Sequence, residues 1–241
     1  MRRRTVFSLL SAAMLAVVAG IALGLTSIAA TPPGPPANPA FESSAQFGVW
    51  ANGGFYINNN MWGPSAGPQT IWAESYSDWG VQSDQPVGNK TVETYPEIQQ
   101  DFSNVLVTSL PALTNSFTEA MPDVTGLDAE AADDVWLNSY GIEVMIWVDN
   151  VGQTPAGKII GHATISGQSF AVWLRGTTYS FVLSGNETSG QTHILTTLKW
   201  LQKQGYVPAS ATLTQVDFGW EIASTGGSPM DFTMTNYSLH S

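Results

Sequence analysis

Short runs in which apolar and polar residues alternate recur along most of this chain, separated by Gly, Asn, Pro or Ser. A period of two is typical of strands that bury one face. In chain order the runs cover residues 47–51, 54–58, 69–73, 104–108, 133–137, 142–149, 158–165, 169–174, 179–183, 213–221 and 231–239. Residues 192–204 differ, because their leucines and isoleucine recur at helical spacing before a Gly and a Pro. We therefore expect one all-β domain, an antiparallel sandwich or barrel with a single helix.

Three of these runs carry carboxylates on the face opposite their apolar positions. In 142–149 the aliphatic face alternates with a second face made of Glu143, Met145, Trp147 and Asp149. In 213–221 the second face carries Gln215, Asp217, Gly219 and Glu221, and in 133–137 it carries Asp134 and Trp136. On the same pattern we expect Asp133 to lie in a turn or at the surface.

Carboxylates and indole rings on the concave side of a curved sheet are typical of a glycan cleft. Sugar rings stack on Trp, and two carboxyl groups supply the acid, base and nucleophile of glycoside hydrolysis. Acids that face solvent are also common on strands, so alternation alone leaves open that Glu143 and Glu221 are ordinary surface residues.

The charge and composition exclude several other classes of protein. The 241 residues include 19 Asp and Glu against 8 Lys and Arg. This balance argues against nucleic-acid binding, which needs cations to displace counterions from phosphate. The chain has no Cys and only three His without metal-like spacing, so we expect no disulfide, no metal and no cofactor.

The N-terminal segment predicts export. Residues 1–30 combine three arginines, an apolar stretch and small residues, the pattern of a signal peptide. The stretch is also long enough for an uncleaved membrane anchor, the competing interpretation. Residues 31–40 contain five prolines and predict an extended linker, and 41–241 form the folded domain. Without residues 1–30, five Lys and Arg face 19 acids, a net charge of −14.

Short motifs spread over residues 45–240 together resemble glycoside hydrolase family 12, secreted endoglucanases and xyloglucanases with a β-jelly-roll fold. In chain order they are Asn59-Asn60-Met61-Trp62-Gly63, Val92-Glu93-Thr94-Tyr95-Pro96, Asp134-Val135-Trp136-Leu137, Glu143-Val144-Met145-Ile146-Trp147, Pro155-Ala156-Gly157 with Phe170-Ala171-Val172-Trp173, and Val216-Asp217-Phe218-Gly219-Trp220-Glu221. The chain differs from many members in lacking a cysteine pair, and its acidic stretch 74–84 has no counterpart that we can place.

The resemblance implies a role for individual residues. Glu143 would be the nucleophile and Glu221 the general acid/base of a retaining endo-β-1,4-glucanase acting on cellulose, β-glucan or xyloglucan. Asp134 would support Glu143, and Met145 would pack beside the reacting sugar. Substrate-binding residues would be Asn60, Trp62, Trp147 and Trp136, although the last two are equally well explained by packing within the sandwich. We expect a monomeric enzyme with no nucleic-acid partner and no membrane contact once the signal is removed.

Two alternatives remain. A non-catalytic jelly roll, such as a lectin or carbohydrate-binding module, would keep the Trp residues but has no need for two opposed carboxylates. The xylanases of family 11 share the architecture, but their nucleophile strand reads differently from residues 143–147.

Overall fold

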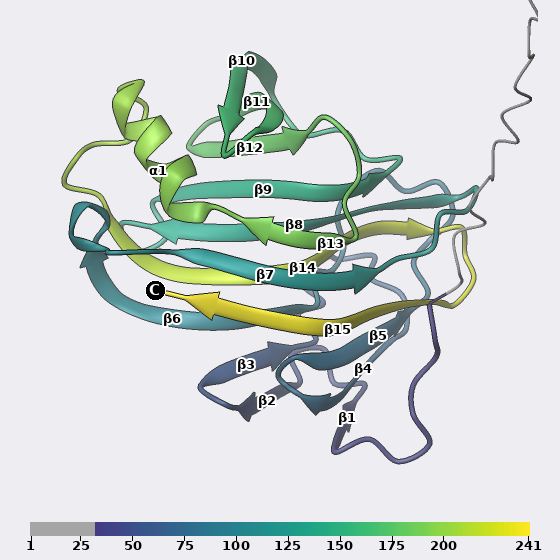
Figure 1. Cartoon of the computed structure of the whole chain (residues 1–241). Coiled ribbons are helices and arrows are strands. Elements are labelled where there is room, and N and C mark those ends of the chain that lie inside the picture. The colour runs from purple at the N-terminus through teal and green to yellow at the C-terminus, as the bar shows by residue number, and fades with distance from the viewer. Residues whose placement is uncertain (1–31) are drawn as a thin grey trace, which may run out of the picture.

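The structure, a computed structural model, describes residues 32–241, so the predicted signal peptide 1–30 lies outside the described residues. Two sheets stack face to face in Figure 1. The smaller has the order β1-β4-β5-β15-β7-β13: β1 Phe41–Ser43, β4 Gln69–Ser75, β5 Asp78–Ser83, β15 Met230–His240, β7 Thr114–Ala120 and β13 Ser189–Thr192. The larger has the order β10-β11-β12-β9-β8-β14-β6-β3-β2: β10 Lys158–Ile165, β11 Gln168–Arg175, β12 Thr178–Leu183, β9 Ile142–Val151, β8 Leu127–Leu137, β14 Thr212–Thr225, β6 Glu97–Leu106, β3 Phe55–Asn58 and β2 Val49–Asn52.

The expected all-β sandwich with one helix is confirmed. Helix α1, Ile194–Lys203, packs against β7 and the 3₁₀ turn η1, Val107–Ser109, at one end of the sandwich (Figure 1). Every strand pair is antiparallel except β9 with β12, which run parallel. Residues 152–157 carry the chain from the end of β9 back to the end at which β9 starts, so that β10 runs in the same direction as β9 and the hairpin β10–β11 then delivers β12 parallel to it.

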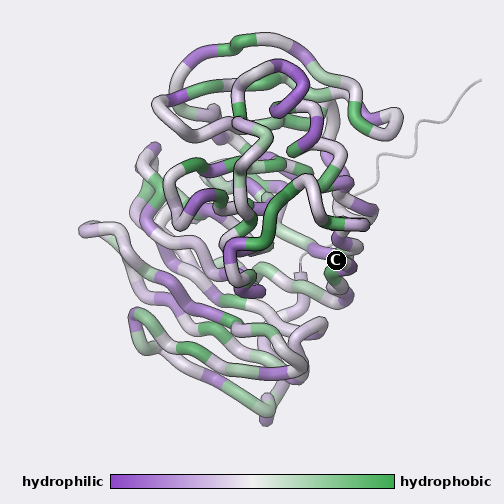
Figure 2. Tube along the Cα trace, turned by 90° about the vertical axis from the view of Figure 1, so that its left-hand side faces the viewer, coloured by the Kyte–Doolittle hydropathy of each residue, from purple (hydrophilic) through white to green (hydrophobic). Residues whose placement is uncertain are grey.

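The core lies between the two sheets. Figure 2 shows that hydrophobic and hydrophilic residues alternate over short stretches of the chain, as expected for strands with one buried face. One part of the core joins the helix to aliphatic residues of β8, β9 and β14, and the other contains Trp79, Phe117, Phe218, Trp220 and Phe232. No helix in residues 32–241 is long and apolar enough to cross a membrane.

Four strands of the smaller sheet, β1, β5, β7 and β13, were not predicted by the pattern. The acidic stretch 74–84 contains the end of β4 and all of β5, and its Trp79 is fully buried. Strand β7 turns Asn115, Phe117 and Glu119 inward. Asn115 and Glu119 are polar although they are buried, so the alternation of apolar and polar residues that predicts a strand is missing here. The predicted strand 104–108 is instead the end of β6 followed by η1.

Two acidic residues lie inside the sandwich, contrary to the sequence prediction. Asp133 is fully buried and accepts a hydrogen bond from Asn115 of β7, because it shares the inward face with Val135. Asp149 also points inward, toward Glu119, because the β8–β9 ladder shifts by one residue next to Trp147. This β-bulge reverses the face that simple alternation assigns to Asp149.

Candidate active site

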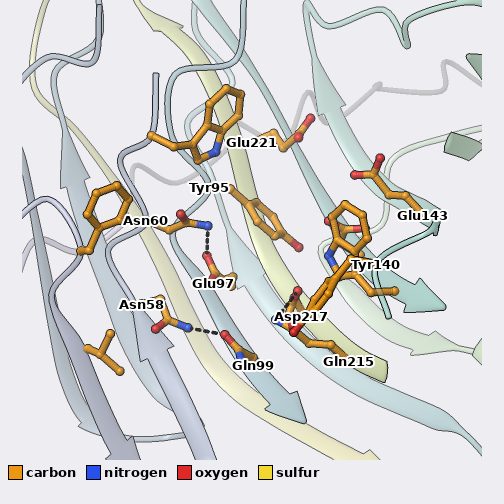
Figure 3. Close-up of a pocket in the computed structure, with 15 residues that line it drawn as sticks. Asn58, Asn60, Tyr95, Glu97, Gln99, Tyr140, Glu143, Gln215, Asp217 and Glu221 are labelled. Carbon is orange, nitrogen blue, oxygen red and sulfur yellow. Dashed lines mark hydrogen bonds between the residues drawn. The ribbon is translucent and has the colours of Figure 1, made fainter. Parts of the chain in front are cut away.

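The open face of the larger sheet is hollowed into a cleft with two adjoining parts, of about 610 and 420 Å³. Trp62, Glu143 and Glu221 line both parts. Figure 3 shows Glu143 and Glu221 projecting into the cleft from strands on either side of β8. The two glutamates therefore stand where a bound chain would pass from one part of the cleft to the other.

The glutamates face different positions of β8, since Glu143 lies opposite Trp136 and Glu221 lies opposite Glu130. In a flat sheet these positions would be far apart. The twist and curvature of the nine-stranded sheet bring both carboxyl groups into one cleft.

Glu143, on β9, is half-buried and accepts a hydrogen bond of 2.6 Å at Oε2 from the hydroxyl of Thr178. The parallel pairing of β12 with β9 sets Thr178 directly beside Glu143. This hydrogen bond orients the carboxyl group of Glu143 at the edge of the cleft, where it is able to reach a bound molecule.

Glu221, on β14, is in a different environment. Burial raises its pKa from 4.5 to about 7, and the charge of Glu143 adds to the rise, while a hydrogen bond with Glu130 opposes it. Trp220 and Ile222 donate backbone hydrogen bonds to the carbonyls of Pro96 and Thr94, and these bonds hold this part of β14 against the segment 94–96 that precedes β6. Glu221 is thus a carboxylic acid over most of the acidic and neutral range.

Gly219 explains how β14 approaches the segment around Pro96 and Glu97 so closely. A Cβ atom at this position would collide with the carbonyl oxygen of Pro96 and the backbone of Glu97. Glycine two residues before Glu221 therefore permits the contact that fixes the strand.

Asp134 lies between these strands, on the cleft face of β8, with 6% of its surface exposed. Burial first, and then the charge of Glu143, raise the pKa of Asp134 well above its usual range. A protonated Asp134 beside Glu143 is able to donate a hydrogen bond to the Glu143 carboxylate.

The predicted binding residues differ in how far they reach the cleft. Trp62 is 49% exposed, and Asn60 donates a hydrogen bond of 3.1 Å to Glu97 (Figure 3). Trp136 is half-buried and packs against Tyr140. Trp147 borders the second part of the cleft but is only 3% exposed. Trp62 and Trp136 therefore offer ring surface, whereas Trp147 mainly supports the floor.

Met145 lies in that floor as well. It is 5% exposed, packs with Ala132 and Trp147 on the cleft side of the sheet, and its sulfur lies 3.7 Å from the hydroxyl of Ser180. The side chain borders the second part of the cleft beside Glu143.

Several polar residues of the cleft were not singled out by the sequence. They are Tyr95, Glu97, Gln99, Thr178, Gln215 and Asp217, and the fully buried Glu130 lies beside Glu221. The alternation in residues 213–221 places Gln215 and Asp217 on the same face as Glu221, and it therefore predicts that these two side chains also face the cleft. Glu97 and Gln99 follow the Val92–Pro96 motif on β6, but that segment was not recognised as a strand.

Other side chains hold the acidic residues of the cleft floor. Within residues 32–241 no three His, Asp or Glu side chains are grouped so that they could hold a metal ion. Glu97 and Asp217 are instead bonded by amide side chains, from Asn60 and Gln215 respectively.

Comparison with known proteins identifies the family. The model described as Glycosyl hydrolase family 12 matches residues 53–240. The chain belongs to this family. It is therefore a glycoside hydrolase, and the purely glycan-binding alternative is not favoured.

Several known proteins are similar to this family 12 enzyme over most of its length. Endoglucanase A of Aspergillus kawachii is 30% identical over 209 residues, covering 76% of this chain and 86% of the relative. A probable xyloglucan-specific endo-beta-1,4-glucanase A of Aspergillus flavus is 26% identical over 207 residues, covering 77% and 84%. Among solved structures, the xyloglucanase domain of NopAA from Sinorhizobium fredii, in complex with cellobiose, superimposes with a TM-score of 0.77 at 26% identity. It covers 84% of this chain and 99% of that domain.

We expect kcat/KM of the family 12 enzyme to fall above about pH 7. The reason is the raised pKa of Glu221, because as the predicted general acid it would have to carry a proton in the free enzyme to donate to the leaving oxygen. The measurement is kcat/KM on soluble β-glucan from pH 4 to 9. A profile that stays flat up to pH 9 would contradict this assignment, and the same profile on the exposed-site variant Glu74→Gln serves as control.

Proposed function

We propose that this family 12 enzyme is a secreted, retaining endo-β-1,4-glucanase that cleaves internal bonds of cellulose, mixed-linkage β-glucan or xyloglucan. The observation that carries the proposal is the pair of carboxyl groups in unlike environments. Glu143 receives a hydroxyl hydrogen bond, and the pKa of Glu221 is raised to about 7 by burial. Two such groups across one cleft supply a nucleophile and an acid.

In the first step the Glu221 carboxyl group gives its proton to the glycosidic oxygen. The bond from that oxygen to the anomeric carbon breaks, and the Glu143 carboxylate bonds to the same carbon. In the second step the Glu221 carboxylate takes a proton from water while the water oxygen attacks the anomeric carbon and releases Glu143. Two inversions give a product of retained configuration.

The shape of the cleft supports cleavage within a chain. Parts of the cleft lie on both sides of the glutamates, so sugar units can bind before and after the broken bond. The larger part carries the exposed side chains of Phe47, Val49 and Trp62 along one wall. The aromatic rings of Phe47 and Trp62 are flat and can stack on the C–H faces of glucosyl rings, while Val49 adds apolar surface beside them. The relatives named for glucanase and xyloglucanase activity support the same class of substrate.

The test is a panel of barley β-glucan, xyloglucan, carboxymethyl-cellulose and xylan, with the products followed by ¹H NMR from the first minutes. We expect the β-anomer to form first on at least one β-1,4-glucan, with little hydrolysis of xylan. First formation of the α-anomer would contradict a retaining mechanism. Binding of these polymers without hydrolysis by the wild-type protein would instead favour the lectin-like alternative.

The proposed secretion rests on residues 1–30, whose basic start, apolar stretch and small residues form a signal peptide pattern. The high acid content of the remaining chain is compatible with an exported protein. N-terminal sequencing of the protein recovered from the culture medium would identify the cleavage point.

A further inference from the structure

Glu130 is a fully buried carboxyl group beside Glu221 that the two-step mechanism does not use. It lies on β8 directly opposite Glu221 in the β8–β14 ladder. Its side chain is fully buried, and both of its carboxyl oxygens lack a hydrogen-bond partner outside the acidic groups around them, within residues 32–241. A buried ionised carboxylate with no partner is unstable, whereas a protonated one has a hydrogen to donate.

The surroundings of Glu130 keep it protonated. The groups facing it are Glu221 from β14, Glu143 from β9 and Asp134 from β8 itself, and burial together with these charges raises the pKa of Glu130 well above its usual range. Lys90 and Arg175 both line the second part of the cleft, and Lys90 is paired with Asp128, two residues before Glu130 on the same strand. Asn150, opposite Glu130 on β9, carries no charge.

We propose that Glu130 is a positioning residue that keeps a proton beside Glu221 and donates a hydrogen bond to the Glu221 carboxylate formed in the first step. This inference rests on the proposed function, in which Glu221 is the general acid/base. Once Glu221 has given its proton to the leaving oxygen, the negative charge that Glu143 carried resides on Glu221. Glu130 then donates a hydrogen bond from its O–H to that charge and keeps its own proton. When Glu221 takes a proton from water in the second step, its negative charge is lost and the hydrogen bond from Glu130 weakens again.

Such a donor is useful because Glu221 is buried. Burial alone favours the protonated form so strongly that Glu221 would release its proton reluctantly. A hydrogen bond from Glu130 stabilises the ionised form and makes Glu221 a stronger acid, in agreement with the opposing effect of Glu130 on its pKa. The donor therefore assists the step in which the leaving group must be protonated.

The test compares Glu130→Leu, Glu130→Gln and wild type. Glu130→Leu removes the donor, so the alkaline limb of kcat/KM should move up by about one pH unit, and activity on β-glucan should fall on the order of tenfold. The loss should be smaller on 2,4-dinitrophenyl β-cellobioside, whose leaving group needs no proton. Glu130→Gln keeps a donor and should stay within about twofold of wild type.

Glu119→Gln is the matched control, because Glu119 is another buried acid of raised pKa but lies inside the sandwich, bonded to Trp220. It should leave the alkaline limb in place. An unshifted limb in folded Glu130→Leu, with equal losses on both substrates, would overturn the inference about Glu130. Activity in Glu221→Gln would instead overturn the proposed function itself.

A second measurement decides the matter if Glu130→Leu does not fold. The side-chain carboxyl carbons of wild-type Glu residues are followed by ¹³C NMR against pH, with Glu130→Gln used to assign the Glu130 signal. We expect Glu130 to keep the shift of a protonated acid through the pH range in which Glu221 titrates. A Glu130 signal that titrates below Glu221 would contradict the proposal.

Discussion

Replacing Glu143 by Gln is expected to abolish hydrolysis of β-glucan, with a loss of at least about 10⁴-fold in kcat. The amide keeps the size of the side chain and an acceptor for the Thr178 hydroxyl. It carries no negative charge and cannot form the bond to the anomeric carbon. Circular dichroism and the unfolding midpoint of the variant should match wild type, and Glu74→Gln, on the exposed side of β4, should keep full activity. Full activity of folded Glu143→Gln would remove Glu143 from the mechanism.

Azide distinguishes the role of Glu143 from that of Glu221. In Glu143→Ala the space of the missing carboxylate admits azide, which should restore turnover of an activated aryl cellobioside and give the α-glycosyl azide, of inverted configuration. In Glu221→Ala, azide should act on the glycosyl-enzyme and give the β-azide. The product configuration is read by NMR, and the opposite pairing would mean that the two roles are exchanged.

The enzyme is expected to be most stable in acid and to lose stability steadily between about pH 4 and 8. Eight carboxyl groups have a raised pKa in the folded state: Glu97, Glu119, Glu130, Asp133, Asp134, Asp149, Asp217 and Glu221. For each, burial is the largest cause. A group with a raised folded-state pKa contributes stability that is complete below its unfolded pKa and is lost as pH rises through the folded pKa.

The effect should be large. The shift of Glu221 alone, from 4.5 to about 7, corresponds to about 3 kcal/mol. Rising pH also builds up the net negative charge of the chain, which repels itself and acts in the same direction. Urea unfolding followed by Trp fluorescence at a series of pH values measures the free energy of unfolding.

A matched pair of variants tests the cause of this pH dependence. Glu119→Gln removes one buried titrating group and should flatten the dependence, whereas Glu74→Gln removes an exposed acid and should leave the slope nearly unchanged. A free energy of unfolding that is constant or rises from pH 4 to 8 would show that the buried acids do not behave in this way.

Much of the fold could be predicted because it rests on local patterns. Alternation located most strands of the larger sheet, and helical spacing located α1. The smaller sheet was harder to predict, because its buried positions include polar residues such as Asn115 and Glu119. These residues are stabilised by partners from distant parts of the chain, Asp133 and Trp220, which a local pattern does not contain.

The sequence by itself determined which side chains share a face over the regular parts of the strands that carry Asp134, Glu143 and Glu221. Period-two alternation is local, so it set Glu143 apart from Val144, Glu221 apart from Trp220, and Asp134 apart from Val135, without knowledge of any other strand. The motifs around these residues also pointed to the family that the comparison identified.

Only the tertiary structure decided which strands meet, in which register, and how deeply each acid is buried. The ladder set Glu130 opposite Glu221, the parallel pairing brought Thr178 to Glu143, and a one-residue bulge turned Asp149 inward. Register, bulges and burial depend on contacts between segments far apart in the chain, and the pKa of a carboxyl group depends on burial and neighbouring charge. The proposed acid and the proposed nucleophile are thus two glutamates of the same chemistry, distinguished only by what the folded chain places around each.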